Sequence, residues 1–323
     1  MQKVTTVLNV KKTQGQLEFP DIVTSGADNR LFVDALLVAI NKDELSKKAH
    51  KRFTDFFQTV FNLVREGKAK EQELLDILSN SKENNGFRLG KSEVKANSYA
   101  TGRGCGPDML FKLLTRVEHR RLIQNGTIND PMGIVLYIQN FSEDRMSDLL
   151  ISLIFDLLCE FTEQQALLHD PNAKFVECSG LCWDLESQDW VEFKYNQLLD
   201  SKGVSLSLVP KNIVTDQYRY QADNYLMAHL IQYEQEEELK ADLKKDPDAV
   251  KRNKKLIRKE VQEESGNLST KDLLIQLTLT HHTKNPMGDY KNAVMKKYNG
   301  GLSDSELTSI IEKPYSDIKK GLA

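Results

Sequence analysis

Hydrophobic positions recur at helical spacing through the first part of the chain. Between residues 43 and 65, one predicted helix face carries Phe53, Phe56, Phe57, Val60, Phe61 and Val64. Helical patterns also cover residues 71–78 and the stretch from the glycine-rich segment 101–107 to residue 122. A weak alternation at residues 4–10 is compatible with an edge strand. The N-terminal half is therefore predicted to be mainly helical.

The pattern changes after residue 130. The apolar stretch 146–158 predicts a core helix, and runs with strand composition follow at residues 174–183, 190–198 and 204–214. Helical spacing resumes over residues 218–239. Because short polar turns separate the three runs, they indicate a small antiparallel sheet packed on long helices.

The last part of the chain is charged and helical. Residues 240–267 are dense in Lys, Arg and acidic residues, and the capping-box pattern of Ser303 and Glu306 opens a C-terminal helix. The predicted fold class is α+β, with a helical region 1–130, an α+β core 131–239 and a charged helical region 240–323. The charge-dense segment is interpreted as a solvated helix face, with a nucleic-acid patch as the alternative.

Composition narrows the class of protein. The 323 residues are 40% hydrophobic and 28% charged, which excludes a collagen-like or fully disordered chain. A formal charge of −3 argues against a histone-like coat for nucleic acid, although a local basic groove stays compatible with it. The stretch 146–158 is shorter than the ~20 residues that span a bilayer and contains Asp148 and Asp156. Without an export signal, we expect a cytoplasmic location.

Cysteines and histidines offer little chemistry. Three residues separate Cys178 from Cys182, but no second pair stands at zinc-finger spacing, so free thiols are expected. The histidines lack a nucleophile partner, and the chain has no Gly-x-Ser-x-Gly elbow. A serine or cysteine hydrolase is therefore not indicated.

A glycine cluster is one candidate for ligand binding. Gly102, Gly104 and Gly106 precede a predicted helix, where backbone N–H groups are able to approach a phosphate. Arg103 would supply a charged partner, so Arg103, Gly104 and Gly106 form a candidate phosphate site. The cluster matches neither the P-loop nor the dinucleotide fingerprint, and a simple helix-start turn is the alternative.

Carboxylates form a second group of candidates. Asp144, Asp148, Ser152 and Asp156 recur every four residues along one predicted helix. Asp148 is the more notable because it lies inside the apolar run, and it is either a metal ligand or part of an exposed helix edge.

The third candidate combines two acids and a lysine. Asp184 ends one predicted strand, and Glu192 and Lys194 alternate onto one face of the next. Two carboxylates could hold Mg²⁺ against a phosphodiester while the lysine orients the attacking water.

With this arrangement, residues 143–239 resemble a PD-(D/E)XK nuclease core, in which a helix, a three-stranded meander, a second helix and a further strand follow one another. The resemblance implies Mg²⁺ bound by Asp184 and Glu192, with Lys194 as the electrostatic helper. The pair Gln221 and Tyr225 resembles a Gln-x-x-x-Tyr motif of some members and would support the site. No proline precedes Asp184, and its spacing to Glu192 is short. A second register uses Asp148, Glu192 and Lys211, and spacing does not decide between them.

A further resemblance concerns the biological setting. The glycine cluster, residues 143–148 and residues 208–211 look like segments of uncharacterised bacterial proteins from antiphage defence islands. The sequence thus predicts a metal-dependent nuclease that acts on DNA or RNA in antiphage defence. The alternative is a non-catalytic sensing or scaffolding subunit, which would bind a partner protein or a second copy through its helical parts.

Overall fold

The computed structural model describes residues 2–24, 28–80, 85–90, 107–200, 202–280, 286–298 and 300–313. The chain divides into two compact units, each assembled from separate stretches of sequence. Unit 1 comprises Met1–Phe111, Ser142–Tyr218 and Gly300–Ala323, and unit 2 comprises Lys112–Phe141 and Arg219–Asn299. The units interleave along the chain, and each has its own buried apolar residues.

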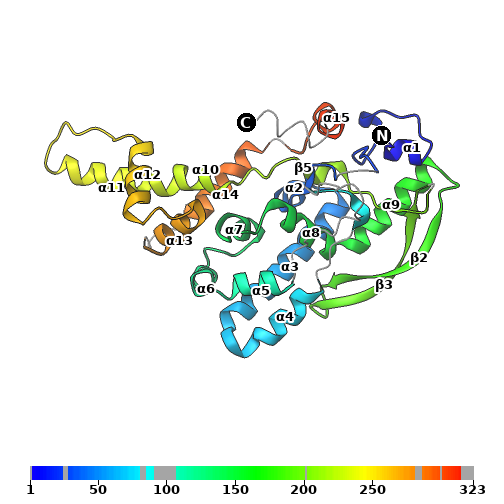
Figure 1. Ribbon diagram of the computed structural model, residues 1–323, viewed down its shortest axis with the longest axis horizontal. Helices are drawn as coiled ribbons and strands as arrows, with labels where there is room; N and C mark the ends of the chain where they lie inside the picture. Colours follow the sequence, from blue (N-terminus) through cyan, green and yellow to red (C-terminus); the bar gives the residue numbers. More distant parts are fainter. Residues whose placement is uncertain are drawn as a thin grey trace. The chain divides into compact units, whose positions relative to one another are not determined.

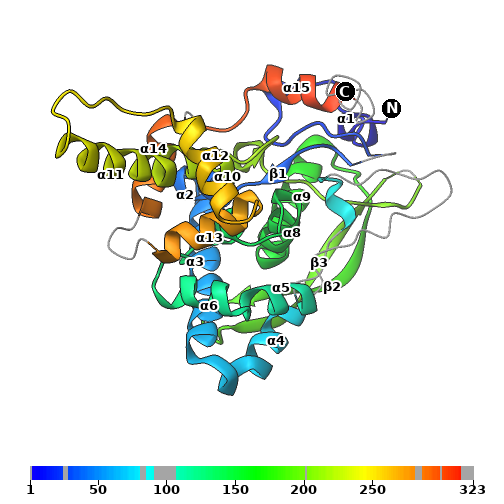
Figure 2. The ribbon, with the colours of Figure 1, turned by 60° about the vertical axis from the view of Figure 1, so that its left-hand side comes forward.

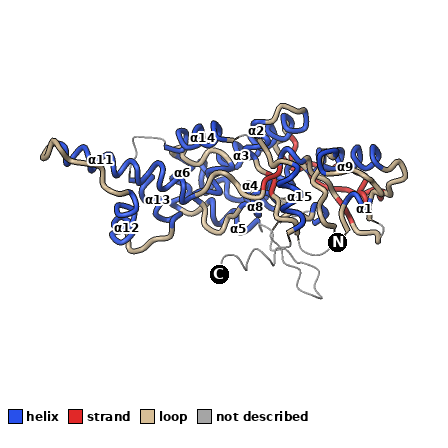
Figure 3. The backbone as a smooth tube through the Cα atoms, turned by 90° about the horizontal axis from the view of Figure 1, so that it is seen from above, coloured by secondary structure: helices blue, strands red, loops and turns tan. Residues whose placement is uncertain are grey.

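Unit 1 contains all the strands of the described chain. Its helices are α1 (Val4–Val7), α2 (Ala35–Ile40), α3 (Glu44–Glu66), α4 (Glu71–Ser79), α8 (Glu143–Leu153), α9 (Phe155–His169) and α15 (Asp304–Glu312). Its strands are β1 (Phe32–Val33), β2 (Phe175–Asp184), β3 (Asp189–Leu199), β4 (Ser205–Leu206) and β5 (Val214–Thr215). The predicted α+β class is confirmed, and Figure 3 shows a few strands among many helices.

The largest sheet is an antiparallel meander in the order β2-β3-β4. β2 and β3 form a long hairpin that packs against α9, beside which both strands lie in Figures 1 and 2. Gly180 in β2 permits this contact, because a Cβ at that position would stand 2.8 Å from the Phe155 ring. The remaining two-stranded sheet joins β1 to β5.

Two strand predictions are wrong. Within residues 204–214, only Ser205–Leu206 pairs with β3; Val214 pairs with β1 in the other sheet. Pro210 has no N–H to donate to a ladder, and the Leu208 N–H is satisfied by the Thr162 hydroxyl instead. At the N-terminus, Val4–Val7 forms a helical turn rather than an edge strand.

The α3 helix is built as its apolar pattern predicts. The Asp43 side chain accepts a hydrogen bond from the Ser46 N–H and caps the helix, and Gly67 ends it with a φ of 81°. Phe56 lies edge-on to both Trp183 and Trp190, so α3 and the hairpin share one aromatic core. Each indole N–H has an acceptor, the Asp55 carboxylate for Trp183 and the Ile77 carbonyl for Trp190.

Unit 2 is helical in its described residues. Its helices are α6 (Val117–Gln124), α7 (Pro131–Tyr137), α10 (Ala222–Tyr225), α11 (Ile231–Leu243), α12 (Lys254–Glu264), α13 (Thr270–Thr280) and α14 (Pro286–Lys297). A π-helical turn, Leu226–Leu230, joins α10 to α11. The unit division falls within α5 (Pro107–Leu114). No helix in the described ranges is both long and apolar enough to cross a bilayer.

Candidate functional site

The hairpin separates the two carboxylates predicted to share a metal ion. Asp184 pairs with Asp189 across the hairpin, whereas Glu192 pairs with Leu181. Paired residues share a sheet face and successive residues alternate between faces. Glu192 lies three positions beyond Asp189, so Asp184 and Glu192 belong to opposite faces of the ribbon. The strand register therefore does not bring these two side chains together.

Asp184 closes the turn between β2 and β3. One of its carboxylate oxygens accepts hydrogen bonds from the Ser187 N–H at 2.8 Å, the Ser187 hydroxyl at 2.9 Å and the Glu186 N–H at 3.1 Å. These donors, the Ser187 N–H first, lower the pKa of Asp184 below its ordinary value. Hydrogen bonds within the turn are therefore sufficient to explain the position and the lowered pKa of the Asp184 carboxylate.

Glu192 and Lys194 share one face of β3, as predicted, and both are exposed. Lys194 forms an ion pair with Glu177 of β2 at 3.1 Å, and the two side chains are 74% and 69% exposed. An ion pair so open to water contributes little to stability and leaves the ammonium solvated. This face of β3 therefore carries charged side chains that are open to solvent and do not line a pocket.

The second register uses residues from three separate elements of unit 1. Asp148 is half-buried on α8, and Glu192 lies on the hairpin. Lys211 lies in a 3₁₀ turn, Lys211–Ile213, and its ammonium contacts the Asp304 carboxylate at 2.9 Å. Asp304 is the first residue of α15, so Lys211 tethers that helix.

Gln221 and Tyr225 lie in unit 2, where Gln221 is half-buried and Tyr225 is part of the core. Tyr225 is fully buried at the end of α10, and its hydroxyl accepts a hydrogen bond from Tyr137 at 3.0 Å. Tyr137 also contacts Thr278, which links α7, α10 and α13. The Gln221 N–H donates to the Tyr290 hydroxyl at 2.9 Å. These contacts give the pair a role in packing α10.

Neither the glycine cluster nor the potential metal ligands form a binding site within the described residues. Arg103, Gly104 and Gly106 lie outside the described residues. Across the described ranges, no three His, Cys, Asp or Glu side chains are grouped closely enough to hold a metal ion. Cys159, Cys178 and Cys182 are free thiols, and burial raises the pKa of Cys182 to about 11. A thiolate ligand or nucleophile is therefore disfavoured there.

A contact between α3 and α9 was not foreseen. Arg52 of α3 donates to both carboxylate oxygens of Asp156 on α9, and the two side chains are only 16% and 18% exposed. Burial opposes the charge of Arg52, but the hydrogen bond and charge of Asp156 outweigh it and raise the pKa of Arg52. The sequence placed Asp156 in a polar stripe without a partner.

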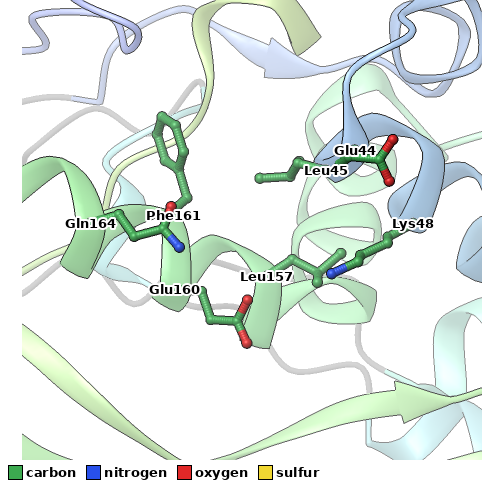
Figure 4. A pocket seen from close by; sticks show the side chains of 7 residues that line it. All are labelled: Glu44, Leu45, Lys48, Leu157, Glu160, Phe161 and Gln164. Atoms are coloured by element: carbon green, nitrogen blue, oxygen red, sulfur yellow. The ribbon is translucent and has the colours of Figure 1, made fainter.

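One turn away from this ion pair, α3 and α9 flank a pocket of about 210 Å³ that is partly open to solvent. Figure 4 shows side chains from both helices turned toward it. Its apolar lining is Leu45, Leu157 and Phe161, and its polar lining is Glu44, Lys48, Glu160 and Gln164. Glu44 is engaged by Lys47 at 2.6 Å, whereas Lys48 and Glu160 lie on facing helices at the open rim.

A sequence signal for the pocket exists but is weak alone. On α9, Asp156, Glu160 and Gln164 repeat every four residues beside Leu157 and Phe161. On α3, Glu44, Lys48 and Arg52 repeat in the same way. Each pattern specifies a helix face with a polar edge, but the pairing of the two faces depends on the fold.

Comparison with known proteins supplies a family and no described activity. No curated protein and no solved structure matches the chain. One family model matches residues 9–221, which is well over half of the chain and includes the α3–α9 pocket and the β2–β3 hairpin. The chain therefore belongs to the DUF8370 family, a domain of unknown function.

Proposed function

We propose that this protein is a partner-binding subunit that holds one apolar side chain of another protein in the α3–α9 pocket. The observation that carries the proposal is the size and chemistry of the pocket. A cavity of ~150 Å³ lined by aliphatic and aromatic groups holds a benzene ring, and this pocket measures about 210 Å³ with Leu45, Leu157 and Phe161 inside. It has room for one leucine or aromatic side chain.

The same volume argues against a cofactor or nucleotide as the occupant. Sites for drug-sized ligands and cofactors span roughly 300–1,000 Å³, and the α3–α9 pocket is smaller. Pockets that accept a single anchor residue are typical of protein interfaces, where a few buried side chains supply most of the binding energy.

The Arg52–Asp156 ion pair favours a preformed pocket. It joins α3 to α9 next to the cavity, and Arg52 also donates to the Leu153 carbonyl at 3.4 Å. A groove held open before binding loses less conformational entropy when a partner docks. An amphipathic helix laid between two helices is a common way to use such a groove.

Rim charges specify the partner further. Glu160 and Lys48 flank the apolar floor on opposite helices. A partner segment that places a cation one turn from its apolar anchor would meet Glu160, and charge complementarity of this kind selects partners and orients them. The expected ligand is therefore a helix with a Leu or aromatic anchor and a neighbouring Lys or Arg.

A peptide selection tests the proposal. A random peptide library displayed on phage is selected on the wild-type protein and counter-selected on Leu45→Trp, which fills the pocket. Enriched peptides should share the anchor-plus-cation pattern and bind Leu45→Trp at least tenfold more weakly by calorimetry. Leu168→Trp is the matched control, because Leu168 also lies on α9 but is 69% exposed and outside the pocket lining. Selected peptides that bind Leu45→Trp as well as wild type would contradict the proposal.

A metal-dependent nuclease is the second candidate function. It is favoured by the α9 helix packed on the β2-β3-β4 meander, the first two elements of the order that the nuclease resemblance implies. The further strand of that order does not occur after α10 in the described residues. The test is incubation of the purified protein with plasmid and Mg²⁺ or Mn²⁺, alongside Glu192→Gln and, as a surface control in the hairpin turn, Glu186→Gln. Cleavage lost only in Glu192→Gln would support this candidate, and equal cleavage by both variants would remove Glu192 from it.

The antiphage setting rests on the sequence resemblance alone. It is tested by challenging cells with phage while they express the wild-type protein or the pocket-filled Leu45→Trp variant. Protection by the wild-type protein but not by Leu45→Trp would indicate that partner binding in the pocket is needed for antiphage defence.

A further inference from the structure

The α11 and α12 helices form an arm within unit 2. The α11–α12 arm comprises α11, the connecting residues 244–253 and α12. Figures 1 and 3 show α11 extending away from the other helices of its unit, with the chain returning from its end toward α12. Gln235 of α11 donates to the Arg252 carbonyl at 2.5 Å, which fixes the returning chain beside the helix.

Positive charge is concentrated on the returning half of this arm. Residues 244–264, which make up this half, contain eight Lys and Arg against five Asp and Glu, in a chain whose formal charge is −3. The preceding α11 carries the other five acidic side chains of the arm and one lysine, Lys240. A local excess of this size on an exposed element creates a positive surface that the overall charge conceals.

Nine cations lie on the arm, and seven of them fall into two groups. The other two have partners on α11: Lys240 pairs with Glu237 at 2.7 Å, and Lys254 donates to the Gln232 side chain at 3.0 Å. Arg252 pairs with Glu238 and Glu260, and Arg258 pairs with Asp223, so these two fix the arm to itself and to α10. The second group is exposed and consists of Lys244, Lys245, Lys251, Lys255 and Lys259. Among the described residues, Lys259 is the only member of this group with a carboxylate within 4.0 Å, Glu263 at 3.7 Å.

Helix stability does not account for these charges. Lys254 and Lys255 occupy the first turn of α12, and Glu263 and Glu264 occupy its last turn. The helix dipole favours the reverse arrangement, with acids in the first turn and bases in the last. The two lysines therefore weaken the helix that carries them, so helix stability does not explain their position.

We propose that the α11–α12 arm binds the sugar–phosphate backbone of duplex nucleic acid without reading its sequence. The cations of the second group are all lysines, which act as mobile point charges rather than as planar, bidentate readers of bases. Residues 234–267 contain no aromatic side chain or histidine, so the arm lacks the stacking platform that single-strand binders use. This inference uses different residues from the α3–α9 pocket and does not depend on it.

Fluorescence anisotropy with a labelled 30-base-pair DNA duplex tests the inference on the full-length protein. The combined variant Lys251→Gln, Lys255→Gln and Lys259→Gln should bind at least tenfold more weakly than wild type at low salt. Each phosphate contact contributes about 0.9 to the slope of log affinity against log salt, so the slope should also become shallower. The matched control removes three exposed lysines of unit 1, Lys47, Lys70 and Lys194.

The outcomes separate the competing partners. Affinity lost only in the arm variant supports the inference. Equal losses in the arm and control variants would show a general charge effect and overturn it. Tighter binding to a single strand of equal length would contradict the preference for a duplex. Binding to polyglutamate but not to DNA would replace nucleic acid with an acidic protein partner.

Discussion

Arg52 on α3 and Asp156 on α9 form a bidentate ion pair, in which each carboxylate oxygen accepts a hydrogen bond from a separate guanidinium nitrogen. Both side chains have lost most of their contact with water. Removing one member leaves the other charge unpaired in a position with little access to water. The resulting loss of folding free energy is larger than the net contribution of the ion pair itself.

We therefore expect Arg52→Met to lower the free energy of unfolding by about 2–4 kcal/mol, somewhat less than the ~3–5 kcal/mol for a fully buried ion pair, because both side chains keep some contact with water. Asp156→Leu alone should cost a similar amount. The double variant Arg52→Met, Asp156→Leu should lose less than the sum, because neither charge is left unpaired. Urea denaturation of the four proteins measures the coupling, and additive losses would show that the pair does not act as a unit.

The Lys194–Glu177 pair supplies the control for this cycle. Both of its side chains are mostly exposed on the hairpin. Lys194→Gln should change the free energy of unfolding by less than about 0.5 kcal/mol, as for other solvated ion pairs. A loss as large as that of Arg52→Met would mean that burial does not set the difference between the two pairs.

Local signals in the sequence located most elements correctly. The apolar face of α3, the two long strands β2 and β3, and the α15 capping box of Ser303 and Glu306 all appear as predicted. Each depends on residues close together in the chain, where periodicity and capping chemistry act. The final strand failed because its apolar run 204–214 is shared between two sheets and a 3₁₀ turn.

The candidate site was harder to predict because its geometry depends on register and on distant partners. Glu192 and Lys194 were correctly placed on one face, since alternation within a strand is local. The face of Asp184 relative to Glu192 depends on the hairpin register, which pairs Asp184 with Asp189. The α3–α9 pocket requires two helix faces that are about a hundred residues apart, and no single-helix pattern specifies that meeting.

Lys211 should act as a tether for α15. Lys211→Met removes its contact with Asp304 and should destabilise the docked helix by about 1 kcal/mol, close to the value of a partly exposed ion pair. Hydrogen exchange of the α15 amides should then rise roughly fivefold. Asp304→Asn should reproduce this effect. If the α15 amides exchanged at the wild-type rate in both variants, the Lys211–Asp304 contact would not stabilise the docked helix.

Tyr225 should contribute to stability through its hydroxyl. Tyr225→Phe removes the acceptor of the Tyr137 hydroxyl, but Tyr137 keeps Thr278 as a partner. The loss should therefore be about 1 kcal/mol, the net value of one hydrogen bond, without the larger penalty of an unsatisfied group. Denaturation measures it, and Tyr233→Phe, at a half-buried position on α11, is the control. A loss above about 3 kcal/mol would indicate an unsatisfied Tyr137 hydroxyl.

Lys271 gives unit 2 a dependence on alkaline pH. Its ammonium lies against the carbonyl oxygens of Val135 at 2.6 Å and Ile138 at 2.7 Å near the end of α7. Burial lowers the pKa of Lys271 from 10.5 to about 8, because removal from water disfavours the charged form. The folded protein therefore binds this proton less tightly than the unfolded chain.

The sign of the effect follows from proton linkage. Between pH 8 and 10.5 the unfolded chain holds the Lys271 proton while the folded protein releases it, so this residue makes the protein more stable as pH rises. The gain should amount to at most about 3 kcal/mol, since each pKa unit corresponds to about 1.4 kcal/mol. Lys271→Met has no titrating group at this position in either the folded or the unfolded state. The unfolding free energy of wild type minus that of the variant should therefore increase with pH over this window. Urea denaturation at pH 7.5, 8.5 and 9.5 measures that difference, with Lys291→Met as a control on an exposed lysine of the same unit. A difference that stays constant with pH would mean that Lys271 keeps its proton, because its carbonyl partners hold the ammonium in spite of burial.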